Sequence, residues 1–237
     1  MTRPRTRAQR QRVRRGGAPG TDERRPSGRQ LAIAGAVAVA AVAALIAISG
    51  GTSAPAASTA PPNVRQAGHV RGVDTAPITI EEWADFQCPA CGQFARTTEP
   101  QLLSTYVANG QVRLVYRHLA FLGTESQWAA EATECADEHG KFWEFHDRLY
   151  AAQAGENRGT FSKENLKRMG DELGLGPSFA ACVDSGRYAQ RVRDETSVGQ
   201  GKGVRATPTL FVGDRRIEGA ASYDQLKAVI DQLLAGR

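Results

Sequence analysis

The sequence of 237 residues has few of the side chains that bind transition metals, with four cysteines and four histidines in all. Cys88 and Cys91 are separated by two residues, a spacing that zinc ribbons also use. Such a zinc site needs a second close pair of ligands. Cys135 and Cys182 stand far apart, and no histidine has metal-ligand spacing to a cysteine. The sequence therefore predicts no metal site, and it shows no need for an organic cofactor.

Acidic residues are almost missing from the first thirty positions. This segment holds ten arginines against Asp22 and Glu23, so it accounts for more than the net charge of +5 of the whole chain. It also has few large apolar residues, and this composition predicts a disordered basic tail over residues 1–30. A nucleic-acid-binding arm is the alternative interpretation, which the next segment disfavours.

An apolar run from Leu31 to Ile48 follows the basic tail. As a helix it would be about 27 Å long, just enough to span a bilayer core. Arginines precede the run and small polar residues follow it, so the positive-inside rule keeps the N-terminus in the cytoplasm. We therefore expect a transmembrane helix over 31–50, a catalytic domain outside the cytoplasm, and no nucleic-acid partner.

Half of this apolar run is alanine, which contributes little to membrane insertion. A cleaved signal peptide is therefore the alternative, with small residues around Ala54–Ala56 as a cleavage region. We favour a retained anchor because the run is longer than the usual apolar region of a signal peptide. Residues 51–69, rich in Ser, Thr, Ala and Pro, predict a flexible linker.

The close cysteine pair follows a strand-like segment. Residues 78–86 are apolar and β-branched in alternation, and Cys88 stands where a helix is expected to begin. Unpaired N–H groups and the dipole at a helix N-terminus stabilise a thiolate, the reactive form of cysteine. Cys91 lies about one helical turn further on, where its sulfur can form a disulfide with Cys88. The pair is a candidate two-electron redox switch with Cys88 as nucleophile.

Glu82 interrupts the apolar face of the same strand. In alternation it shares that face with Ile78, Ile80, Ala84 and Phe86. Burial would raise the pKa of Glu82 and allow it to exchange protons with the thiols. A solvated edge-strand glutamate is the alternative, and the pattern alone favours neither.

The middle of the chain is helical in character. A helix from Cys88 to about Ala108 should be kinked at Pro100, and a second strand is expected over 112–121. Further helices are expected over 126–138, 141–153, 162–173, 177–185 and 187–199. Cys135 and Cys182 lie in this block, where a structural disulfide is favoured over two buried free thiols.

The C-terminal part predicts a β-hairpin around Gly213–Asp214, followed by an amphipathic helix over 223–234. Pro208 precedes the first strand of the hairpin, a position that proline tolerates because it cannot donate to the ladder. A cis Thr207–Pro208 bond would place the Thr207 backbone beside the cysteines, where it could pair with an extended substrate segment.

Three motifs in this order resemble the DsbA-like thiol:disulfide oxidoreductases of the thioredoxin superfamily: Asp85–Cys91, Val115–His118 and Ala206–Phe211. The resemblance covers about residues 70–235. It implies an α/β fold, a thioredoxin-like central mixed sheet flanked by helices over 70–237, with an inserted helical domain over about 124–200.

The resemblance also implies roles for individual residues. Cys88 would be the exposed nucleophile, Cys91 the buried resolving cysteine, and Glu82 the buried acid. Thr207 and Pro208 would form the substrate wall. Apart from the resemblance, we expect Pro89 and Ala90, which lie between the cysteines, to contact substrate as well.

One departure concerns the two residues between the cysteines. Strongly oxidising members of this family carry a histidine there, whereas this chain has Pro89 and Ala90. Without that donor the Cys88 thiolate should be less stabilised and its disulfide a weaker oxidant.

The function expected is a membrane-tethered oxidase that forms disulfides in reduced exported proteins at Cys88 and Cys91. The resemblance implies reoxidation by a quinone-linked membrane partner of the DsbB or vitamin K epoxide reductase type. Two alternatives remain: an extracytoplasmic reductase or isomerase, and a tethered peptide-binding or chaperone module without redox activity.

Overall fold

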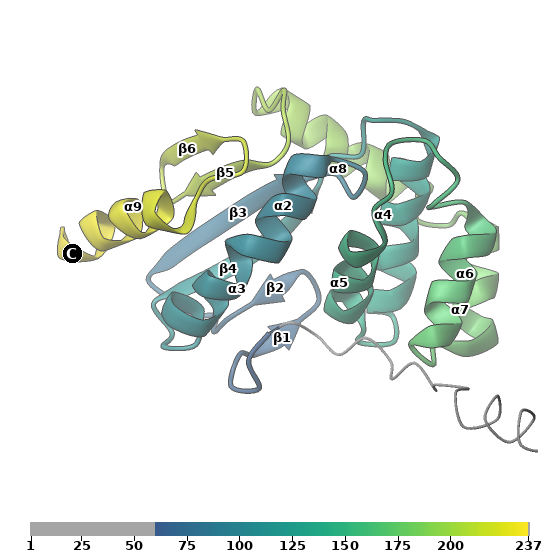
Figure 1. Ribbon diagram of the computed structural model, residues 1–237, viewed down its shortest axis with the longest axis horizontal. Helices are drawn as coiled ribbons and strands as arrows, with labels where there is room; N and C mark the ends of the chain where they lie inside the picture. The colour runs from purple at the N-terminus through teal and green to yellow at the C-terminus, as the bar shows by residue number, and fades with distance from the viewer. Residues whose placement is uncertain (1–59, 237) are drawn as a thin grey trace, which may run out of the picture. The chain divides into compact units, whose positions relative to one another are not determined.

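The computed structural model describes residues 60–236 (Figure 1). The predicted basic tail, the predicted transmembrane helix over 31–50 and residues 51–59 of the predicted linker lie outside the described residues. Within 60–236, no helix is both long and apolar enough to cross a membrane.

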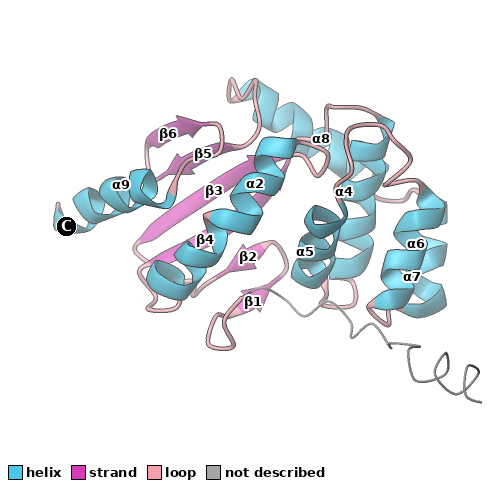
Figure 2. Cartoon of the chain, in the orientation of Figure 1, coloured by secondary structure: helices cyan, strands magenta, loops and turns pink. Residues whose placement is uncertain are grey.

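One mixed sheet runs through the described domain, in the strand order β1-β2-β4-β3-β5-β6. Its two central strands, β3 and β4, are parallel, and every other neighbouring pair is antiparallel. This is the thioredoxin-like mixed sheet that the resemblance implied, with helices on its faces (Figure 2). The strands are Gln66–Ala67 (β1), Val70–Arg71 (β2), Ile78–Ala84 (β3), Val112–His118 (β4), Thr209–Val212 (β5) and Arg215–Glu218 (β6).

The apolar side chains of the central strands meet on one face of the sheet. Ile80 of β3 lies opposite Leu114 of β4 and Val212 of β5, and all three are fully buried. Such rows of β-branched and leucine side chains favour a strand that is covered by helices. The alternation predicted for β3 is therefore present, and it places Glu82 on the covered face.

The first two strands correct the predicted linker, which extended to residue 69. Gln66–Ala67 pair with Val70–Arg71, and Val64 is buried. The fully buried Arg71 forms ion pairs with Glu99 and Asp147. The ordered domain therefore begins before residue 70, and two-residue strands are too short to show alternation in a sequence.

The helix after the cysteine pair is interrupted. The sequence predicts one kinked helix from Cys88 to about Ala108, whereas the structure has Pro89–Thr97 (α2), Glu99–Leu102 (α3) and a π-helical turn at Leu103–Val107 (η1). The break at Thr98 precedes Pro100, whose missing N–H and ring bulk are tolerated only in the first turn of a new helix. Both helices lie across the same face of the sheet (Figure 2).

The helical block between β4 and β5 contains five helices. They are Thr124–Asp137 (α4), Phe142–Ala152 (α5), Lys163–Glu172 (α6), Gly176–Ser185 (α7) and Ala189–Gly201 (α8). Each differs from its predicted range by only a few residues, and the block agrees with the insertion expected over about 124–200. A disulfide joins Cys135 of α4 to Cys182 of α7.

Helix α8 returns the chain to the opposite face of the sheet. There Trp83, Leu119 and Val204 form a small buried cluster of their own. A Cβ on Gly199 would come within 2.6 Å of Trp83 and 2.7 Å of Leu119, so only glycine lets α8 approach β3 this closely. Strand β4, which the sequence predicted over 112–121, ends at His118, three residues before the predicted end at Phe121.

The C-terminal segment agrees with the predicted hairpin and helix. Strands β5 and β6 pair around Gly213, whose positive φ of 57° suits the turn. The final helix, Tyr223–Ala235 (α9), begins with a capping box between Ser222 and Gln225.

Candidate active site

Cys88 lies at the start of helix α2, as the sequence predicted. It is the N-cap residue, with an extended backbone (φ −67°, ψ 120°), and Pro89 opens the helix. Its carbonyl accepts the first helical hydrogen bond, from Gly92 N–H at 3.1 Å. The backbone N–H groups of Ala90 and Cys91 are directed at its sulfur, as unpaired donors at a helix N-terminus are.

These surroundings lower the pKa of the Cys88 thiol to about 6. The largest cause is a hydrogen bond from the Cys91 thiol, which outweighs the opposing effect of burial; the Thr207 side chain and the two backbone N–H groups lower the pKa further. At pH 7 most Cys88 is therefore a thiolate, the nucleophilic form. Both active-site cysteines are free thiols in this structure, and Cys88 is buried rather than exposed as the resemblance implied, because Thr207 and the first turn of α2 surround its sulfur.

Cys91 has the opposite environment. It is completely buried, and burial is the largest cause that raises the pKa of its thiol well above the usual value. The hydrogen bond to Cys88 and the negative charges of Cys88 and Glu82 raise this pKa further. The two sulfurs are therefore unequal at neutral pH, with a reactive thiolate at Cys88 and a protonated thiol at Cys91.

The Thr207–Pro208 bond is cis, and it faces the nucleophile. The Cys88 thiol lies 3.2 Å from the carbonyl oxygen of Thr207, although the two residues are far apart in sequence. Thr207 and Pro208 are buried, Pro89 is exposed and Ala90 is partly exposed. The structure thus brings together all four residues that the sequence marked as a substrate surface.

Glu82 is fully buried near the cysteine pair, and neither of its carboxyl oxygens has a hydrogen-bond partner. Burial raises the pKa of Glu82 well above its usual value, and the charge of Glu99 adds to this effect, while Arg71 opposes it. Its interaction with Cys91 is strong enough to shift the Cys91 pKa. Burial therefore favours the protonated form of Glu82, which can give or take a proton close to Cys91.

A family model described as thioredoxin matches residues 65–232, most of the chain. The chain belongs to the thioredoxin family. The matched range contains the cysteine pair, the cis-proline and the whole helical block.

Two kinds of curated relative share this thioredoxin-family domain. Disulfide bond formation protein D of Bacillus subtilis is 28% identical over 178 residues, which is 71% of this chain and 78% of the relative. The Na(+)/H(+) antiporter NhaA 3 of Salinispora tropica is 37% identical over 165 residues, which is 68% of this chain. The chain spans only 24% of the length of that antiporter.

The solved structure of oxidised BdbD from Bacillus subtilis has the same fold. It is 27% identical to this chain, the TM-score is 0.66, and the match covers 71% of this chain and 93% of BdbD. The unequal cysteine pair of this thioredoxin-family chain, a reactive thiolate beside a protonated thiol, has the chemistry of thiol–disulfide exchange.

Asp85 lies in the first motif and has a structural role that its sequence position did not predict. Its carboxylate accepts hydrogen bonds from the Gln87 N–H at 2.8 Å and the Ser126 hydroxyl at 2.6 Å. It also accepts from the backbone N–H groups of Phe121 and Leu122. Asp85 thus fixes the loop before Cys88 to the end of β4 and to α4. The sequence did offer one sign of this role, because Asp85 is an acidic residue directly after the buried strand β3.

Gln153 is a second residue without a predicted role. It follows α5, and its side-chain amide donates to the carbonyl oxygens of Phe86 at 2.7 Å and Cys88 at 3.0 Å. Its contact with the active-site loop spans more than sixty residues of sequence, so no local pattern could reveal it.

Proposed function

We propose that this chain is an extracytoplasmic oxidase that introduces disulfide bonds into reduced, exported proteins. The observation that carries the proposal is the position of Cys88, a thiol with a pKa of about 6 at a helix N-terminus beside Thr207 and Pro208. A stable Cys88 thiolate favours the reduced enzyme, and therefore favours transfer of the disulfide to substrate. The name of the Bacillus relative, disulfide bond formation protein D, supports the same direction.

The proposed reaction begins with the oxidised enzyme. A substrate thiolate attacks the Cys88 sulfur, the Cys88–Cys91 bond breaks, and Cys91 leaves with the electron pair. Cys91 then takes a proton, for which its raised pKa gives the driving force and buried Glu82 is the nearby source. A second substrate thiolate attacks the substrate sulfur of the mixed disulfide and releases Cys88 as a thiolate. The substrate is oxidised by two electrons and the enzyme is reduced by two.

The substrate surface is proposed to work through backbone pairing. The Thr207 carbonyl oxygen lies beside Cys88 and can accept a hydrogen bond from an extended substrate backbone. Pro89, which is exposed, and Ala90, which is partly exposed, follow Cys88 and are accessible to substrate. Such pairing positions a substrate sulfur without reading its neighbouring side chains, which suits an enzyme with many protein substrates.

Reduction potential tests the direction of electron flow. The Cys88 pKa of about 6 lies between the values of about 7 for thioredoxin and about 3.5 for DsbA. We therefore expect a potential between about −270 and −120 mV, measured by equilibrating the full chain with glutathione. The full chain should also restore activity to reduced ribonuclease. A potential at the thioredoxin end, together with fast insulin reduction, would refute the oxidase proposal.

A reductase or isomerase is the second candidate, favoured by Pro89 and Ala90 in place of a histidine between the cysteines. Neither residue offers a side-chain donor to the Cys88 thiolate. Running the insulin and ribonuclease assays on the same preparation separates the two directions. A non-redox chaperone module predicts instead that Cys88→Ser keeps full activity in suppressing aggregation of an unfolded protein, whereas both enzyme assays are lost.

We also propose that residues 31–50 anchor the chain in the membrane with its N-terminus in the cytoplasm. Reoxidation is then assigned to a quinone-linked membrane enzyme of the DsbB or vitamin K epoxide reductase type. The apolar run and the arginines before it support the anchor. Protease added to intact cells should remove the catalytic domain. Protection of that domain would refute the topology.

A further inference from the structure

Four potential metal ligands converge where the sheet meets the helical block. They are His69 in the turn between β1 and β2, His118 at the end of β4, Glu134 in α4 and Glu195 in α8. Each offers one ligand atom, and these atoms all lie within 4.8 Å of one another. A tetrahedral zinc site with bonds of 2.0–2.1 Å has neighbouring ligand atoms about 3.3 Å apart, so side-chain rotations alone would close this set around an ion.

Both histidines of this cluster contact the same carboxylate oxygen, Oε1 of Glu134. Glu134 Oε1 lies 3.0 Å from Nε2 of His69 and 3.1 Å from Nε2 of His118. The contact of His69 Nε2 is not aligned as a hydrogen bond, although the nitrogen is buried. His118 Nε2 is hydrogen-bonded to this oxygen, and the two imidazole nitrogens therefore converge on one carboxylate oxygen, as ligand atoms around a shared ion do.

Contacts outside the cluster hold the ligands in place. The other oxygen of Glu134 lies 3.0 Å from the guanidinium of Arg191, which leaves Oε1 directed at the histidines. Glu195 accepts a hydrogen bond from the His118 backbone N–H at 3.2 Å. The His69 ring stacks on Phe142 with their centroids 4.1 Å apart. Supporting contacts of this kind orient the ligands in protein metal sites.

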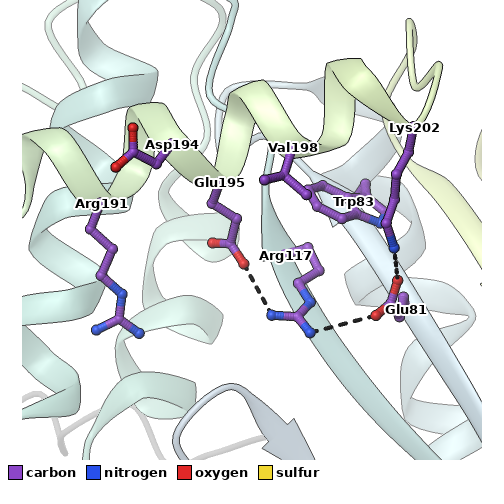
Figure 3. Close-up of a pocket in the computed structure, with 8 residues that line it drawn as sticks. All are labelled: Glu81, Trp83, Arg117, Arg191, Asp194, Glu195, Val198 and Lys202. Atoms are coloured by element: carbon purple, nitrogen blue, oxygen red, sulfur yellow. Dashed lines mark hydrogen bonds and ion pairs between the residues drawn. The ribbon is translucent and has the colours of Figure 1, made fainter.

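A solvent-facing pocket borders the cluster at Glu195. Its volume is about 370 Å³, and Glu195 and Arg191 both line it (Figure 3). Figure 3 shows the Glu195 carboxylate directed towards Arg117, with which it forms an ion pair of 3.3 Å. Of the four ligands, Glu195 lines this pocket, so an ion entering from solvent would meet Glu195 first.

The geometry points to a structural binding site for a divalent transition-metal ion of the zinc class, formed by His69, His118, Glu134 and Glu195. Imidazole nitrogens select zinc-like ions over calcium or magnesium, which prefer all-oxygen ligands. Both carboxylates pair with arginines in this structure, Glu134 with Arg191 and Glu195 with Arg117, so a bound divalent ion would compete with these two guanidinium groups for them. The bound ion would tie the β1–β2 turn and the end of β4 to α4 and α8. Spacing to a cysteine, which the sequence prediction used, does not detect such a site.

The test uses the full chain without a polyhistidine tag and with Cys88→Ser and Cys91→Ser, so that the active-site thiolates do not bind metal. This background also makes the result independent of the proposed redox function. The protein is titrated with Co²⁺, whose visible absorption reports tetrahedral coordination, and then with Zn²⁺. We expect one Co²⁺ per chain, displaced by one Zn²⁺, and a higher melting temperature with either ion.

Three variants identify the ligands. His118→Ala and Glu134→Gln should weaken Zn²⁺ binding by more than about 100-fold, beyond the 10- to 100-fold typical of a residue that only orients a ligand. His69→Gln, in a partly exposed turn, provides the same test where a buried variant fails to fold. His139→Ala is the matched control, because His139 is exposed and outside the cluster. Absence of one-to-one binding in the parent, or undiminished binding in His69→Gln, would overturn the site.

Discussion

The side-chain amide of Gln153 donates a hydrogen bond to the carbonyl oxygen of Cys88 at 3.0 Å. The same amide nitrogen lies 2.7 Å from the carbonyl oxygen of Phe86. Gln153 belongs to the helical block, whereas both carbonyls belong to the loop that carries the nucleophile. The block therefore supports the position of the Cys88 backbone directly.

Gln153→Ala should destabilise the chain and slow the enzyme. The variant leaves the Phe86 carbonyl without its donor and removes one donor from Cys88, which should lower the free energy of unfolding by about 1–3 kcal/mol. A less fixed Cys88 should also oxidise a reduced peptide more slowly. Urea unfolding and stopped-flow fluorescence measure the two effects. Gln93→Ala, an exposed glutamine of α2, should change neither.

Cys91→Ala should raise the pKa of Cys88 from about 6 towards the ordinary thiol value of 9.0, because the Cys91 hydrogen bond is the largest cause of the lowered pKa. The midpoint of the alkylation rate of Cys88 with iodoacetamide against pH measures this change. In the unaltered reduced chain Cys91 does not interfere, since it is buried and its pKa is raised. A midpoint that stays near 6 in Cys91→Ala would mean that the helix N-terminus alone stabilises the thiolate.

Stability of the reduced chain should depend on pH through the same thiol. The folded pKa of Cys88 lies below its unfolded value of 9.0, so its contribution is complete above pH 9 and is lost as the pH falls towards 6. The unfolding free energy of the reduced chain, minus that of Cys88→Ser, should therefore rise between pH 6 and 9. Subtracting the variant removes the effects of other titrating groups. A flat difference would contradict the lowered pKa.

The sequence predicted well those elements whose limits are set by residues next to them in the chain. Helix α7 was expected over 177–185 and extends over Gly176–Ser185, because a proline near its start and a glycine after its end mark its limits. The nucleophile was equally local, since the strand, the turn and Cys88 follow one another within a few residues. The cis bond at Thr207 was considered from the position of Pro208 at the head of a strand, and the structure contains it.

The parts that sequence missed depend on distant contacts. Strands β1 and β2 are held by the buried Arg71 and its ion pairs to Glu99 and Asp147, which no residue near the hairpin reveals. Gln153 is likewise an ordinary helix-end glutamine until the fold brings it to Cys88. Burial of Glu82, which the pattern left undecided, required the helices that cover β3.

Glu82→Leu should stabilise the protein and impair catalysis. Leucine removes a buried carboxyl group that has no hydrogen-bond partner, so the free energy of unfolding should rise by about 1–3 kcal/mol. The raised pKa of Glu82 means that the folded state keeps a proton that the unfolded state loses above pH 4.5. The gain should therefore increase as the pH rises above 4.5. Urea unfolding of the oxidised protein at several pH values measures it.

Glu81→Leu is the matched control for Glu82. Glu81 is partly exposed on the other face of β3 and forms ion pairs with Lys202 and Arg117. Its replacement should not stabilise the protein, and the rate at which Cys91 is released should stay unchanged. Equal rates for Glu82→Leu and the parent enzyme would show that Cys91 receives its proton from another source.

Removing the disulfide between α4 and α7 should affect stability without affecting redox chemistry. Cys135 and Cys182 are 47 positions apart, and a loop of that length restricts the unfolded chain by about 4 kcal/mol. Cys135→Ala with Cys182→Ala should lower the free energy of unfolding by up to that amount. In a background with Cys88→Ser and Cys91→Ser, reductant should lower the stability of the chain that keeps Cys135 and Cys182 but not of the chain that lacks them. Because neither alanine contacts the active-site loop, the Cys88 pKa should stay at about 6, and a shifted pKa would show that the helical block positions Cys88 through this disulfide.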